Sequence, residues 1–130
     1  MAETTNKYKL EDRTLQFSVR IIQHCMRIKQ SQLQPITNQL IRSATSIGAN
    51  YAEANNASSK TDFRAKIFIA KKEAAETKYW LKILAELGDK TDEIVYLQEE
   101  VQGILMTLQK IINTLKSNLE NGERQTHGKS

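Results

Sequence analysis

The residues best suited to chemistry lie together in the segment RSATSIGANYAEA, residues 42–54. Ser46, Asn50 and Glu53 bring a hydroxyl, an amide and a carboxylate to one edge of a helix, which is the minimum for a nucleophile, a hydrogen-bond donor and a base. Gly48 and four alanines stand among them, and small residues let a second helix approach closely. The segment is therefore either an active site or a packing seam.

Helical geometry favours the packing seam. A helix turns by about 100° per residue, so one face of the segment collects its apolar side chains. These inward positions are Ala44, Ile47, Tyr51 and Ala54. Ser46, Asn50 and Glu53 fall toward another edge, where we expect structural hydrogen bonds to the adjoining helix or its turn.

The remaining catalytic side chains do not assemble into a known type of site. A di-iron centre in a bundle needs two Glu-x-x-His pairs, whereas the chain has only His24 and His127, and neither follows a glutamate at that offset. Cys25 diverges from His24 on a helix, so we expect a small buried thiol beside a surface or edge histidine. No phosphate-binding glycine loop, Zn-type cysteine cluster or Gly-x-Ser-x-Gly turn occurs in the sequence. These patterns predict no enzymatic activity, no metal and no cofactor.

Two lines of basic residues would suit an anionic partner. The third expected helix carries five cations within a strip about 40° wide, namely Lys60, Arg64, Lys71, Lys78 and Lys82. The first expected helix carries Arg13, Arg20 and Arg27 at seven-residue intervals. Cationic surfaces attract phosphates without reading a sequence. The alternative is an ordinary solvated face, on which Lys82 pairs with Glu86.

Four amphipathic helices must position these side chains. Apolar residues recur at three- and four-residue intervals in four stretches, about 12–29, 35–55, 60–87 and 92–120. The first stretch is expected to bury Leu15, Phe17, Ile21, Ile22, Cys25 and Ile28. Residues 123–130 contain no apolar side chain and are expected to form a mobile tail after a single domain at 1–122.

Sequence signals mark the ends of these helices. Pro35 suits the first turn of the second helix, because its missing N–H would have no partner there. Ser59 and Thr91 are expected to cap the third and fourth helices. Gly88 tolerates the left-handed backbone that ends a helix.

Length and composition limit the fold class. A chain of 130 residues forms one domain, and five glycines with one proline disfavour a turn-rich β architecture. Short connections between long helices favour antiparallel neighbours, so we expect an all-α, up-down-up-down four-helix bundle. The single cysteine excludes an internal disulfide, and no apolar run resembles a signal peptide or membrane span, which predicts a cytoplasmic protein without a membrane partner. The formal charge of +4 is compatible with nucleic acid.

The third expected helix has more apolar surface than one bundle face requires. Beyond its main buried stripe it carries four further large apolar side chains, Phe68, Tyr79, Trp80 and Ile83. Surplus apolar surface on a helix points to a partner, most often a copy of the same chain. We therefore expect these residues at an oligomer interface.

Together with residues 58–81, SSKTDFRAKIFIAKKEAAETKYWL, the segment at 42–54 resembles the bacterial four-helix-bundle family named for 23S rRNA intervening-sequence proteins. The resemblance covers about residues 10–119, and its recurring positions are Arg42, Ala44, Ser46, Ile47, Ala49, Asn50, Ala52, Glu53, Ser58 or Ser59, Asp62, Phe63, Ile69, Ala70, Ala74 or Ala75, and Glu76. Ala54 and Asn55 depart from the Glu-Gly that often opens the family's turn.

The resemblance implies a homopentameric antiparallel bundle with no known enzymatic activity. Some members are encoded inside insertions in rRNA genes, which suggests RNA as a partner. A more distant resemblance is to the accessory protein of diversity-generating retroelements, a basic pentamer that binds a reverse transcriptase and nucleic acid.

Two functional hypotheses follow. The first is a non-enzymatic homo-oligomer that binds RNA or a ribonucleoprotein through the two basic lines. The second is a protein-interaction scaffold, such as an accessory subunit to a reverse transcriptase or another enzyme, without direct RNA binding. An enzymatic role would require Ser46, Asn50 and Glu53 to face a solvent-accessible pocket.

Overall fold

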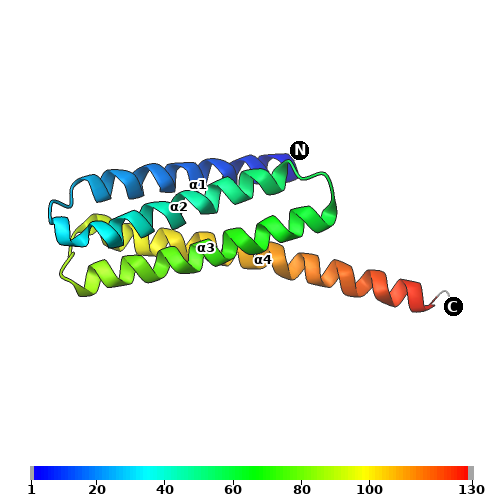
Figure 1. Cartoon of the computed structure of the whole chain (residues 1–130). Coiled ribbons are helices and arrows are strands. Elements are labelled where there is room, and N and C mark those ends of the chain that lie inside the picture. The colour runs from blue at the N-terminus through cyan, green and yellow to red at the C-terminus, as the bar shows by residue number, and fades with distance from the viewer. Residues whose placement is uncertain (1, 129–130) are drawn as a thin grey trace.

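Four helices run up and down in chain order (Figure 1). The computed structural model describes residues 2–128, and it describes side chains over residues 8–122. The helices are α1 (Ala2–Met26), α2 (Gln34–Asn55), α3 (Lys60–Glu86) and α4 (Asp92–Gly128). A short 3₁₀ turn, η1 (Ser31–Leu33), precedes α2, and no strand occurs within the described residues.

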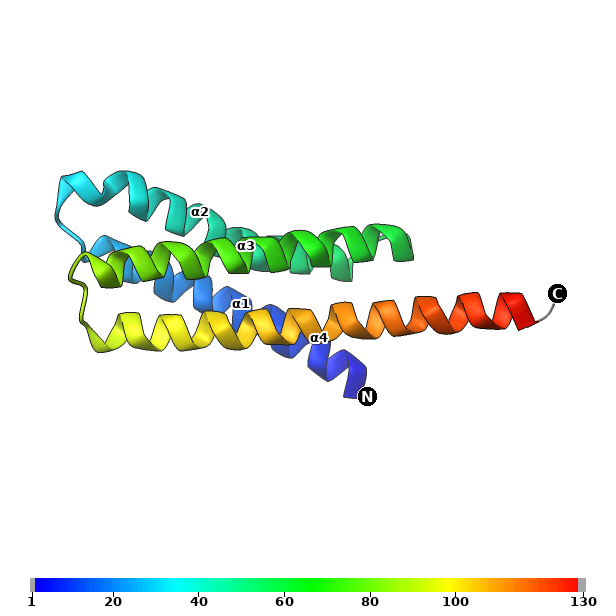
Figure 2. The same ribbon diagram turned by 90° about the horizontal axis from the view of Figure 1, so that it is seen from below.

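The four helices form a closed ring of neighbours. α2 packs most extensively against α3, and the other packed pairs are α1 with α2, α3 with α4, and α1 with α4. In both views α4 continues past the end of the other helices (Figures 1 and 2). The expected all-α antiparallel four-helix bundle is thus confirmed.

Local chemistry fixes where the helices begin and end. Ser59 Oγ accepts the Asp62 N–H at 3.0 Å at the start of α3, and Thr91 Oγ1 accepts the Ile94 N–H at 3.2 Å at the start of α4. Gly88 has a φ of 114°, a conformation that other residues rarely adopt, and it follows the end of α3. The two caps that begin helices and the glycine that ends one all act as the sequence predicts.

Two helices extend beyond their predicted ranges. α1 begins at Ala2 rather than near residue 12 and ends at Met26 rather than at residue 29, because residues 2–11 contain no proline or glycine to stop it. α4 continues to Gly128, so the expected tail is helical as far as that residue, and residues 129–130 lie outside the described part of the chain. An interior glycine such as Gly122 costs only about 1 kcal/mol in a helix.

The buried face of α1 is narrower than predicted. Leu15 and Ile22 are 58% and 36% exposed, because α1 packs against only α2 and α4. His24, expected at the surface or an edge, is buried, whereas Cys25 is buried as expected. Burial raises the pKa of the Cys25 thiol to about 11, so the group stays protonated at neutral pH.

The segment at 42–54 is a packing seam on the α1 side as well as the α3 side. A Cβ added to Gly48 would lie 3.1 Å from Thr14 Oγ1, so glycine allows α1 and α2 to approach at this point. One turn away, Ser18 Oγ donates to the Ala44 carbonyl at 3.3 Å. The small residues of the segment therefore serve close packing.

A buried polar pair joins the C-terminal end of α1 to the connection between α3 and α4. His24 Nε2 lies 2.6 Å from Asp89 Oδ2, and their side chains are 5% and 13% exposed. Thr91 donates to the other carboxylate oxygen from its hydroxyl and its backbone N–H. Burial would raise the pKa of Asp89, but the hydrogen bonds from Thr91 and His24 outweigh it and hold that pKa below its usual value.

We expect Asp89→Asn to lower the free energy of unfolding by about 1–3 kcal/mol at pH 7, because it weakens a buried polar network. A group whose pKa falls on folding stabilises the native state above its unfolded pKa, about 3.9 for Asp, and loses that contribution as pH falls through its folded value. The difference in free energy of unfolding between wild type and variant, measured by urea denaturation, should therefore become smaller below pH 4. Asp12→Asn, which removes an exposed carboxylate, is the control, and equal losses for both variants would contradict the assignment.

Candidate nucleic-acid interface

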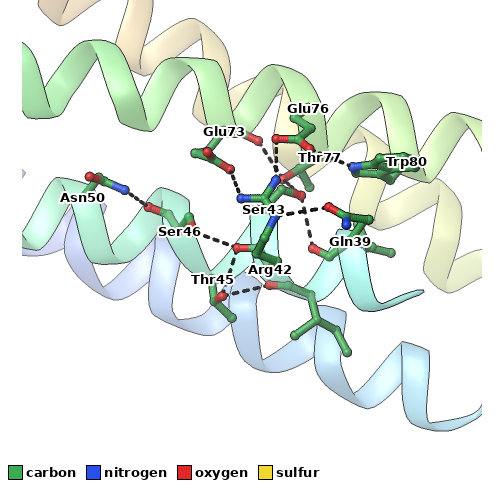
Figure 3. Close-up of polar contacts among 12 residues, drawn as sticks. Gln39, Arg42, Ser43, Thr45, Ser46, Asn50, Glu73, Glu76, Thr77 and Trp80 are labelled. Carbon is green, nitrogen blue, oxygen red and sulfur yellow. Dashed lines mark hydrogen bonds and ion pairs between the residues drawn. The ribbon is translucent and has the colours of Figure 1, made fainter. Parts of the chain in front are cut away.

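Arg42 of α2 is the centre of a polar network with α3 (Figure 3). Its Nη1 lies 3.1 Å from Glu73 Oε2 and its Nη2 lies 2.6 Å from Glu76 Oε2. The Trp80 indole N–H donates to the other oxygen of Glu76 at 3.3 Å. One guanidinium thus holds two carboxylates that are one helical turn apart on α3.

Beneath this network lies a buried hydroxyl pair. Thr77 Oγ1 and Ser43 Oγ are 2.8 Å apart, and both residues are fully buried. Thr77 Oγ1 also lies 2.8 Å from the Glu73 carbonyl oxygen, so the pair is tied to the backbone of α3. Ser43 Oγ likewise donates to the Leu40 carbonyl of α2 at 3.2 Å, so the contact between the two hydroxyls is a polar link that favours this alignment of α2 and α3.

The candidate catalytic side chains of the segment have structural contacts. Ser46 Oγ donates to the Arg42 carbonyl at 2.7 Å and Asn50 Nδ2 donates to the Ser46 carbonyl at 2.8 Å, both within α2 (Figure 3). Their expected bonds to the adjoining helix are absent, because a helical side chain reaches its own carbonyl one turn back. Glu53 does reach α3, where its carboxylate lies 2.7 Å from Lys66 Nζ.

Both charges of the Arg42–Glu76 pair persist at neutral pH. The hydrogen bond from Arg42 is the largest cause that lowers the pKa of Glu76, and the bond from Trp80 lowers it further. The same bond raises the pKa of Arg42. The Glu76 carboxylate is therefore ionised and held against Arg42 of α2.

This arrangement leaves all the cations of α3 except Lys66 without a described carboxylate partner. Lys66 pairs with Glu53, but no described carboxylate lies within 4.0 Å of the basic strip or of Lys72 beside it. The strip consists of Lys60, Arg64, Lys71, Lys78 and Lys82, all exposed except half-buried Lys71. The Lys82–Glu86 pair of the alternative interpretation is not formed. At 1.5 Å per residue, the strip spans about 33 Å.

The basic line on α1 is different from the strip on α3. Arg13 and Arg20 each donate two hydrogen bonds to one carboxylate of α4, Glu100 and Glu93 respectively, at 2.7–3.0 Å. Arg27 is exposed and makes no ion pair with a described carboxylate. Only one of the three arginines predicted to bind nucleic acid is thus available to an outside anion, because α4 supplies acids at the matching seven-residue interval.

Neighbouring groups also hold the two paired arginines in place. The Arg20 guanidinium lies 3.7 Å from the centroid of the Tyr96 ring, which adds a cation–π contact. Gly103 leaves room for the other guanidinium, since a Cβ there would lie 2.4 Å from Arg13 Nη2. These arginines connect α1 to α4.

The expected interface residues of α3 divide into two groups. Phe68 and Tyr79 are 42% and 59% exposed, whereas Trp80 and Ile83 are half-buried. Tyr79 and Trp80 meet edge to face with ring centroids 5.4 Å apart.

Sequence reasoning missed a row of exposed apolar side chains on α1. Their three- and four-residue spacing is the signal that could have revealed them: Leu15, Val19, Ile22 and Met26.

The described residues contain neither a metal site nor a membrane-spanning helix. No group of three or more His, Cys, Asp or Glu side chains in this part of the chain is placed to hold a metal ion. None of the described helices combines the length and the apolar character needed to cross a membrane.

Comparison with known proteins gives two positive results. The family model described as 23S rRNA-intervening sequence protein matches residues 6–117. A crystal structure of a protein with unknown function from the S23 ribosomal protein family of Bacteroides thetaiotaomicron VPI-5482 is 37% identical, with a TM-score of 0.73, and the match covers 79% of this chain and 97% of that chain. The search of curated proteins finds no match.

We expect Arg42→Gln to lower the free energy of unfolding by about 1 kcal/mol, because it leaves Glu73 and Glu76 without their shared cation. Lys78→Gln removes one positive charge from an exposed position of α3 without breaking an ion pair, so it should leave stability unchanged. Urea denaturation of both variants at low salt measures the difference. If they lose the same amount, Arg42 does not stabilise the α2–α3 contact.

Proposed function

Because this chain belongs to the 23S rRNA-intervening sequence protein family, we propose that it is a non-enzymatic, cytoplasmic bundle that assembles with copies of itself and binds RNA or a ribonucleoprotein. The observation that carries the proposal is the strip of five cations on α3, none with a described carboxylate partner. An unpaired lysine or arginine can neutralise a phosphate without first breaking an ion pair. The strip therefore favours binding along a phosphate backbone.

The geometry supports contacts to phosphates rather than to bases. The strip is linear and follows one helix over about 33 Å, and most of its side chains are exposed lysines, which act as point charges. Such contacts set position and affinity but carry no sequence information. We therefore infer binding with little sequence preference and a strong dependence on salt.

A non-catalytic role agrees with the contacts in the segment at 42–54. Ser46 and Asn50 donate to carbonyls of their own helix, and Glu53 pairs with Lys66. Ser46 and Asn50 thus support α2 itself, and Glu53 joins α2 to α3.

Self-assembly would use the apolar side chains left uncovered by the single bundle. Phe68 and Tyr79 are exposed on α3, and a second apolar row is exposed on α1. We propose a homopentamer, in which five copies of the basic strip would produce a stronger field than one. These same exposed residues favour the second candidate function, a protein-interaction scaffold such as an accessory subunit to an enzyme.

The charge reversals Lys71→Glu, Lys78→Glu and Lys82→Glu, made together, should sharply weaken binding to a mixed-sequence, single-stranded RNA of about 20 nucleotides. Three lost phosphate contacts should also reduce the slope of log K against log salt by about 2. Filter binding from low to physiological salt measures both quantities.

The matched control reverses Lys9, Lys29 and Lys116, which lie outside α3 and change the net charge by the same amount. Equal losses in the two triple variants would mean that net charge, not the strip, attracts RNA. No RNA binding by the wild type at low salt would overturn the proposal, and recovery of one partner protein after nuclease treatment would then support the scaffold.

Assembly should appear in solution as a mass of about 74 kDa, for five chains of 14.8 kDa each. Tyr79→Glu places a charge on the exposed apolar face of α3 and should shift the protein toward smaller species. Light scattering coupled to size exclusion measures the mass, with Lys78→Glu as the control, because this exposed residue lies about 100° around α3 from Tyr79. A wild-type monomer at micromolar concentration would refute self-assembly.

A further inference from the structure

A pocket, here called the end pocket, is lined by residues from the segments 9–13, 51–55 and 107–115 and by Phe63. Its volume is about 1080 Å³, just above the range typical of small-molecule sites. Figure 2 shows α4 continuing past the other helices. All four helices line it: α1 near Leu10, α2 near Tyr51, α3 at Phe63, and α4 around Leu115. The pocket is separate from the strip of α3 cations and does not depend on the proposed function.

The lining of the end pocket is mainly apolar. Leu10 and Tyr51 are buried in the core, whereas Phe63, Ile111 and Leu115 are only half-buried. Because α4 continues beyond the bundle, its apolar row has no further helix to cover it at this point. A ligand with an apolar body would remove this surface from water.

The hydroxyl and guanidinium groups of the lining already have partners. Thr107 and Thr114 donate to carbonyls of α4 at 2.9 and 3.1 Å, and Arg13 is paired with Glu100. The buried Tyr51 hydroxyl has its pKa raised mainly by burial, so it remains neutral. None of these groups provides an unbalanced charge inside the pocket.

Two exposed lysines supply the uncompensated charge. Lys9 of α1 and Lys110 of α4 line the pocket, and neither forms an ion pair with a described carboxylate. The carboxylate of Glu11 acts on Tyr51 but is not part of the lining. The pocket therefore combines an apolar interior with two ammonium groups.

We propose that the end pocket binds a single-chain fatty carboxylate. The acyl chain lies against Leu10, Phe63 and Leu115, and the carboxylate is held between Lys9 and Lys110. Both halves of the ligand are required, because exposed lysines alone bind small anions weakly and the apolar lining alone does not select a charge.

The test is calorimetric titration of the full chain with dodecanoate below its micelle concentration. We expect saturable binding of one dodecanoate per chain, weaker binding of dodecanol, which has the same chain length without the charge, and no binding of butyrate. Lys9→Gln with Lys110→Gln should weaken dodecanoate binding about fivefold to tenfold and leave dodecanol unchanged.

Two further variants keep the test decisive. Thr114→Trp places a large side chain in the pocket and should abolish binding of both ligands, while Lys29→Gln with Lys116→Gln removes two lysines outside the lining and should change neither. Thermal denaturation confirms that each variant is folded. Absence of saturable dodecanoate binding, or equal affinity for dodecanoate and dodecanol in the wild type, would overturn the proposal.

Discussion

The alignment of α2 with α3 is the constraint on which the surface of this protein depends. The hydroxyls of Ser43 and Thr77 lie 2.8 Å apart in a fully buried position. A shift of either helix would break the hydrogen bond between them and leave each hydroxyl with only a carbonyl of its own helix. This alignment brings Arg42 opposite Glu73 and Glu76. A buried contact between two small polar side chains thus determines which charges of α3 remain available.

Charge is distributed by helix pairing rather than by composition. The net charge of +4 does not show which carboxylates pair with which cations. Glu93 and Glu100 of α4 hold arginines of α1, and Glu73 and Glu76 of α3 hold Arg42 of α2. The lysines of α3 other than Lys66 have no described carboxylate partner, so a modest excess of positive charge is concentrated on one helix face.

The sequence was sufficient for the architecture because helix periodicity and caps are local. Ser59, Gly88 and Thr91 act within one turn of their own position, and their roles follow from residue type. The pairing of Arg13 and Arg20 was missed because it depends on residues more than 70 positions away. Leu15 was wrongly expected to be buried for a related reason. Periodicity identifies the apolar face of a helix but not how many neighbouring helices cover it.

Gly103 links the packing of α1 to the protein's surface charge. A methyl group at this position would lie 2.4 Å from the end of the Arg13 side chain, which is flexible enough to swing away. A larger residue would therefore require the Arg13 guanidinium to move relative to Glu100, while the backbone of both helices can stay in place. A single substitution on α4 can thus change how a guanidinium of α1 is held at the surface.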